Sequence, residues 1–203
     1  MTYVRVPLVA GALLLSLVAC SDEEPADSGA IGVAREEAGC APIRTEPFVT
    51  PPSGSHHVPE GTELDYPSPP AAELHHDAFP MPTEQKNLYS AADRPPLPDL
   101  VHLTEHGYNV LWYDETIAGD EDAMADLRAI AEEYPTGKYL VIAPWTGTDG
   151  DPFPDDKHVT LTHWTGPDDM QSVWEYCDRV SGEVVDEFTA AYTKENSPEP
   201  GAP

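Results

Sequence analysis

The sequence predicts an α/β or α+β domain, in which two helices pack on a mixed sheet that is preceded by a proline-rich wrapping segment. Residues 41–100 hold 13 of the 23 prolines. Proline lacks an amide donor and fixes φ, which excludes a helix bundle or a central sheet there. Residues 101–193 instead alternate between strand-like and helix-like patterns, in the order β-α-β-β-α. The chain of 203 residues suits one domain with its own core.

The strands are predicted by runs of aromatic, β-branched and apolar residues. Such runs occupy 108–113, 138–143 and 158–163. Between the first two, apolar residues such as Leu127 recur at helical spacing, and Pro135 closes the pattern. We therefore expect a helix over 121–134.

A second helix is predicted after the last of these strands. Pro167 and two following acids suit its first turn. Its apolar face runs through Val173, Trp174, Cys177 and Val180, and the pattern resumes after Ser181-Gly182 over 184–192. Residues 41–100 should wrap around this unit as extended segments and turns, with one short strand over 61–66.

The first 19 residues have the form of a lipoprotein signal peptide. Arg5 precedes an apolar run that is too short to span a bilayer, and Leu17-Val18-Ala19-Cys20 has the form of a lipoprotein cleavage box. We expect Cys20 to become the lipidated N-terminus of a protein anchored outside the cytoplasmic membrane of a bacterium. The alternative is an ordinary signal peptide that leaves Cys20 as a spare thiol.

Charge and composition divide the rest of the chain. Residues 20–39 are predicted to be a disordered acidic tether, 40–193 a single globular domain and 194–203 a disordered tail. The formal net charge of −27 excludes nucleic acid as a partner, because such a surface repels phosphates and attracts cations. The expected contact with the membrane is therefore the lipid anchor.

Two cysteines remain once Cys20 is acylated. Cys40 and Cys177 lie in an oxidising compartment if the protein is exported, so the simplest expectation is a disulfide between them. The alternative is a redox or metal-binding thiol, which is disfavoured because the chain has no Cys-x-x-Cys motif.

Histidine is the residue type that points to chemistry. Six of the eight histidines lie between residues 56 and 106, and the densest group is His102-Leu-Thr-Glu105-His106. Two histidines four residues apart can face one ion, with Glu105 as a ligand or an orienting group. The run also matches the His-x-x-Glu-His motif of zinc peptidases. We expect it at the entrance of a strand rather than in the helix that this motif requires. The structural alternative is a pair of hydrogen-bonded histidines that bind nothing.

The chain resembles the domain-of-unknown-function 3105 family of exported, often membrane-attached bacterial proteins. The resemblance covers residues from about 56 to 198 and depends mainly on the His-x-x-Glu-His-Gly run. Relatives have alanine where His163 stands, and a Gly-Pro stretch where this chain has 71–74. The matching segments are His57-Val58, Pro69-Pro70 through His75, Leu100 through Gly107, Trp112-Tyr113, Leu161 through Trp164, and Phe188 to Tyr192. The resemblance implies no established activity.

These observations support a metal-binding hypothesis. The candidate ligands are His57, His75, His102 and His106 with Glu105 in support, and His76 and His163 remain open. Imidazoles with a carboxylate suit Zn(II) or Cu(II). No catalytic residue is assigned. One alternative is an envelope interaction or structural module without metal, and another is a hydrolase that uses a metal-bound water with Glu105 as its base.

Overall fold

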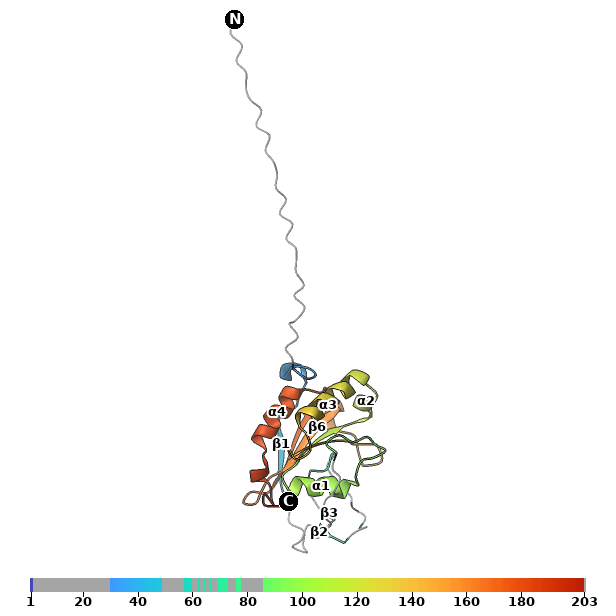
Figure 1. The fold of residues 1–203 in the computed structure, drawn as a ribbon, viewed down its shortest axis with the longest axis vertical. Coiled ribbons are helices and arrows are strands. Elements are labelled where there is room, and N and C mark those ends of the chain that lie inside the picture. The colour runs from blue at the N-terminus through green and yellow to red at the C-terminus, as the bar shows by residue number, and fades with distance from the viewer. Residues whose placement is uncertain are drawn as a thin grey trace.

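The structure is a computed structural model that describes residues 1, 30–48, 57–59, 62, 64, 66, 69–72 and 86–202, together with the backbone of 76 and 77. A five-stranded sheet forms its centre, in the order β1-β7-β6-β4-β5 (Figure 1). β4 and β5 are parallel and the other neighbours are antiparallel, so the sheet is mixed as predicted. The strands are β1 (Arg44–Pro47), β4 (Asn109–Tyr113), β5 (Leu140–Pro144), β6 (Val159–Trp164) and β7 (Gln171–Cys177).

Four α-helices accompany the sheet in the described part of the chain, where two were predicted, and the fold is α+β. They are α1 (Leu97–Glu105), α2 (Glu115–Ala118), α3 (Glu121–Glu133) and α4 (Gly182–Ala191). Three short 3-10 helices are η1 (Arg35–Glu37), η2 (Pro154–Asp156) and η3 (Lys194–Asn196). A separate two-stranded parallel sheet pairs β2 (His57–Val58) with β3 (His76–Asp77).

Both faces of the central sheet are buried, because alternate strand residues enter two different cores. In β4, Leu111 and Tyr113 join the core that contains residues of α3 and α4. Val110 and Trp112 point the other way, into a core with residues of α1 and of the proline-rich region. Figure 1 shows α1, β2 and β3 at one end of the molecule, opposite η1.

The described part of the proline-rich region packs against β7, as the prediction of a wrapping segment requires. The Trp174 indole donates a hydrogen bond to the Pro70 carbonyl at 2.9 Å, and the Tyr176 hydroxyl donates to the Pro69 carbonyl at 2.9 Å. Ala71 and Ala72 are buried beside them. The strand expected over 61–66 lies largely outside the described residues, and residues 62, 64 and 66 are not in a strand.

The predicted helix over residues 167–180 is wrong, because residues 171–177 form β7. Trp174 and Tyr176 enter the core on the α1 side, whereas Val173 and Cys177 enter the opposite core. Helix α4 begins only after Ser181, whose hydroxyl accepts a hydrogen bond from the Val184 amide.

The Cys40–Cys177 disulfide is present, and it joins the N-terminal arm to the last strand rather than to the last helix. This N-terminal arm comprises residues 30–39, which directly precede Cys40 and are the end of the predicted tether. Val33 donates a backbone hydrogen bond to Val180 at 3.0 Å, and Arg35 forms an ion pair with the buried Glu175 at 2.8 Å. Residues of the predicted tether therefore make contacts with the domain that was expected to begin at residue 40. Among the described residues, no helix combines the length and apolar character needed to cross a bilayer.

Candidate metal centre

Helix α1 carries most of the centre, and its two ends suit the residues found there. Pro96 occupies the N-cap and Asp99 the first turn, where a missing amide costs little and a negative charge is favourable. Gly107 follows the helix with φ of +92°, and a Cβ atom there would lie 2.6 Å from the Cα of Lys194. The glycine therefore lets the chain turn while residues 194–202, the C-terminal tail, pass close to the end of α1.

The prediction that His102–His106 lie at the entrance of a strand is wrong. His102 and Glu105 lie within α1, and His106 is the C-cap of this helix. Leu100, Val101 and Leu103 of this helix enter the core, which explains why the segment is helical despite its neighbouring prolines. Residues three apart lie on the same side of a helix, so α1 sets His102 beside Glu105.

The first group of candidate ligands is His57, His102 and Glu105. One potential ligand atom from each lies within 4.8 Å of the other two. His57 Nε2 is 3.2 Å from Glu105 Oε2, and His102 Nε2 is 3.7 Å from the same oxygen. The Glu105 side chain is fully buried and the His102 side chain is 8% exposed, whereas the His57 side chain is 37% exposed. The group is therefore closed on the α1 side and reaches solvent through His57.

The second group is Glu105, His106 and Glu199, whose ligand atoms also lie within 4.8 Å of one another. His106 Nε2 is 3.8 Å from Glu199 Oε2, and the His106 ring is 4.6 Å from the His102 ring between centroids. Glu199 belongs to the C-terminal tail, and its amide donates a hydrogen bond to the Glu105 carbonyl at 3.0 Å. Glu105 is thus common to both groups.

The Glu105 carboxylate is a candidate metal ligand because it is fully buried. An anion removed from water needs hydrogen-bond donors or a cation beside it, or it takes up a proton. Among the described residues, the imidazoles of His57 and His102 lie within ion-pairing distance of Glu105. Two imidazole nitrogens and one carboxylate oxygen are the donor set of many Zn(II) sites.

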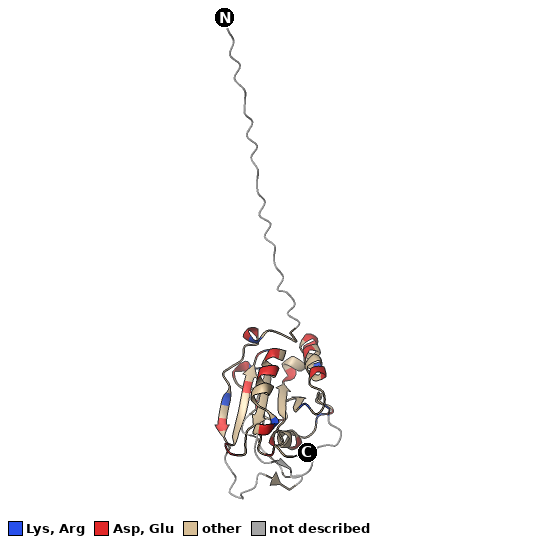
Figure 2. Ribbon diagram, turned by 60° about the vertical axis from the view of Figure 1, so that its left-hand side comes forward, with Lys and Arg blue, Asp and Glu red and all other residues tan. Residues whose placement is uncertain are grey.

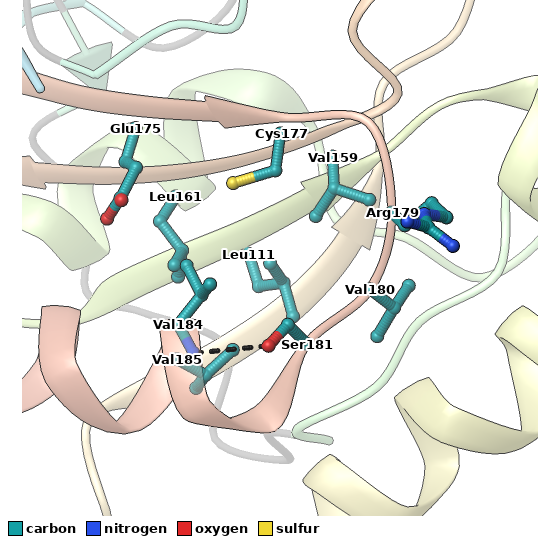
Figure 3. A pocket seen from close by; sticks show the side chains of 10 residues that line it. All are labelled: Leu111, Val159, Leu161, Glu175, Cys177, Arg179, Val180, Ser181, Val184 and Val185. Atoms are coloured by element: carbon teal, nitrogen blue, oxygen red, sulfur yellow. Dashed lines mark hydrogen bonds between the residues drawn. The ribbon is translucent and has the colours of Figure 1, made fainter. Parts of the chain in front are cut away.

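A third group of possible ligands, Cys40, Glu175 and Cys177, does not suit a metal. Its two sulfur atoms are joined in the disulfide, and metal binding requires thiolates. The small cavity beside it is lined by the residues labelled in Figure 3 and has a volume of about 10 Å³. Such a space holds one water molecule at most, so it is not a ligand-binding pocket.

Comparison with known protein families matches residues 57–203 to the model of "Protein of unknown function (DUF3105)". The chain belongs to the DUF3105 family. The DUF3105 match begins at His57 and includes every side chain of both groups. No curated protein and no solved structure matches the chain in the corresponding searches.

The DUF3105 domain brings four of the five predicted metal ligands into one region, namely His57, His102, Glu105 and His106. His75, the fifth, lies outside the described residues, as do Cys20 and the signal peptide except for Met1. His76 is described by its backbone, which pairs with His57 in the β2–β3 sheet.

His163, the residue left open as a ligand, has a different environment. It is fully buried in β6, and its ring lies 5.7 Å from the Tyr192 ring between centroids. Burial lowers the pKa of His163 to about 4, although nearby groups of Asn196 and Tyr108 oppose part of this shift. It belongs to neither group of candidate ligands in the described part of the DUF3105 domain.

Sequence reasoning missed Glu199. It stands in a Pro-Glu-Pro segment of the residues for which a disordered tail was predicted, and it is 93 positions from His106 in numbering. A single acid in such a segment carries no sequence signal for a ligand. Its position follows from the path of the tail across α1 in the DUF3105 domain.

Proposed function

We propose that this domain binds one transition-metal ion through His57, His102 and Glu105, and that Cys20 anchors it to the outer face of the cytoplasmic membrane. The observation that carries the first part is the fully buried Glu105 carboxylate with two imidazole nitrogens within 3.7 Å of one of its oxygens. A bound cation would compensate this buried charge directly. The anchor is supported by the Leu17–Cys20 box in the sequence.

The donor set favours Zn(II) or Cu(II). Both ions accept imidazole nitrogen and carboxylate oxygen, whereas Mg(II) and Ca(II) prefer oxygen alone. Three protein ligands leave a further coordination position, and the exposed side of His57 provides access to it. His75 remains a candidate for this position, since it precedes His76 in the chain.

The test measures metal binding by the full chain in detergent, purified without a polyhistidine tag. Metal content after dialysis is followed by calorimetric titration with Zn(II) and Cu(II). We expect His102→Ala and Glu105→Gln each to weaken binding by about 100-fold or more, because each removes a direct ligand. His57→Ala should have the same effect, and its partly exposed position makes it the variant least prone to misfold.

A control is needed because the surface is strongly acidic. Asp and Glu, red in Figure 2, are spread over the described domain, and the chain has a net charge of −27. Titrations therefore contain about 0.15 M NaCl, which screens exposed charges beyond about 8 Å, and excess Mg(II). His158→Ala is the matched control, because His158 pairs with Asp114 at 2.8 Å and belongs to neither ligand group. Equal binding by His158→Ala and His57→Ala, or none by the unmodified chain, would contradict the proposal.

A further inference from the structure

Glu105 belongs to both groups of candidate ligands, and a carboxylate has two oxygen atoms with which it can bind two ions. We infer that His106, Glu199 and Glu105 form a second metal position, so that Glu105 bridges two divalent ions in a dinuclear centre. The inference rests on the proposed function, because the first ion occupies the His57, His102 and Glu105 position. It adds a ligand from the C-terminal tail and changes the stoichiometry.

The backbone of the tail is held in place by contacts that do not involve the Glu199 carboxylate. Lys194 Nζ donates hydrogen bonds to the Tyr139 hydroxyl and the Ala202 carbonyl, each at 2.9 Å. Gly166 donates a backbone hydrogen bond to Asn196 at 2.8 Å, and Ser197 is fully buried. The position of Glu199 beside His106 is therefore set by the fold rather than by attraction between these two side chains.

The distances suit a shared ion better than a direct hydrogen bond. His106 Nε2 and Glu199 Oε2 are 3.8 Å apart, beyond the usual hydrogen-bond range of about 2.7–3.2 Å. Two ligands of a tetrahedral zinc ion, each about 2.1 Å from the metal, lie about 3.4 Å from each other. A small approach of the half-exposed Glu199 side chain would give that spacing.

Charge gives a second, independent reason. Glu105 and Glu199 place two carboxylates close together at the end of α1, where like charges repel each other. A cation between them removes the repulsion. Carboxylate-bridged metal pairs lie about 3.5–4 Å apart, which the shared use of Glu105 permits. The net charge of −27 offsets the added positive charge of a second divalent ion.

The test is the stoichiometry of Zn(II) bound by the full chain in detergent, measured by elemental analysis and calorimetry. We expect two ions per chain for the unmodified protein and one for Glu199→Gln, with the first ion still bound. Glu195→Gln is the matched control from the same tail, and it should keep two ions, because Glu195 belongs to neither ligand group.

The possible outcomes separate the two proposals. No ion bound by the unmodified chain would reject the proposed function and this inference together. One ion bound by the unmodified chain would keep the proposed function and reject the second position. Two ions bound by Glu199→Gln would also reject the second position, because the tail ligand would then be dispensable. In Cu(II)-loaded protein, magnetic coupling between the ions should appear in the spin-resonance spectrum and disappear in Glu199→Gln.

Discussion

The imidazole of His163 lies in a fully buried strand position, whereas the His57 side chain is partly exposed. Burial lowers the pKa of His163 to about 4 from an ordinary value of 6.5. The unfolded chain therefore binds a proton at a pH where the folded chain does not. This difference links the stability of the whole domain to pH through one residue.

We predict that the free energy of unfolding falls as the pH drops from 6.5 toward 4. The native pKa of His163 is depressed, so its contribution to stability is complete above the unfolded-state pKa and is lost on acidification. Between about pH 7 and pH 5 the loss attributable to His163 is about 2 kcal/mol. Urea unfolding of the unmodified chain and of His163→Phe measures it as the difference between their pH dependences. Identical dependences in the two proteins would show that another group is responsible.

The burial of His163 could not be predicted from the sequence. Its strand was predicted correctly, but alternation along residues 158–163 does not reveal that both faces of the sheet are covered. The histidine cluster that includes His57 and His102 could be predicted, because it depends only on the positions of histidines in the sequence. Their approach to the same oxygen of Glu105 depends on how the β2–β3 sheet lies against α1, which no local pattern encodes.

At the scale of elements, α3 owes its start to Asp120. The carboxylate accepts hydrogen bonds from the amides of Asp122 at 3.0 Å and Ala123 at 3.2 Å. We expect Asp120→Ala to lower the free energy of unfolding by about 1 kcal/mol, because two helix amides lose their partner. Asp120→Asn should retain most of the stability, since an amide oxygen also caps. Urea denaturation checks both, and an equal loss in the two variants would mean that charge rather than capping matters.

Local signals predicted α3, β4 and β6 but failed for α1 and β7. In β7 the apolar residues Val173, Trp174 and Cys177 fit a helical face by their spacing. The strand is covered on both sides, so the alternation of polar and apolar residues that would have identified it is absent. For α1, the His102–His106 run was expected at the entrance of a strand because Gly107 and a strand-like run follow it, although Pro96 and Pro98 stand where a first helical turn tolerates them.

At the scale of the whole molecule, the disulfide joins residues separated by 137 positions. Closing so long a loop restricts the unfolded chain, and the loop-entropy model gives a stabilisation of about 4–5 kcal/mol. We predict that Cys40→Ser with Cys177→Ser lowers the free energy of unfolding by an amount in this range. Urea denaturation of the unmodified chain under reducing conditions should reproduce the value for the double variant. A loss below about 1 kcal/mol would show that the N-terminal arm is held by its other contacts.

The proposed lipid anchor provides a prediction that is independent of the proposed metal centre. Cys20→Ser should block lipid attachment, so that the protein is released from membranes or accumulates as its precursor. Cys40→Ser is the matched control, since it removes a thiol without touching the cleavage box and should remain with the membrane. Fractionation of cells followed by immunoblotting distinguishes them. Equal membrane association of the two variants would reject the anchor.

The arrangement of the ends of the described domain determines which way the proposed metal centre faces. Residues 35–37 lie at the end of the molecule opposite α1, β2 and β3 (Figure 1). An anchor at Cys20 would attach the protein through the end that carries η1, so α1 and β2, which carry the candidate ligands, would lie at the end away from the lipid. A domain of this size is about 40 Å across, whereas the potential of anionic headgroups decays within about 8 Å. Ion affinity at the centre should therefore be the same on neutral and on anionic vesicles.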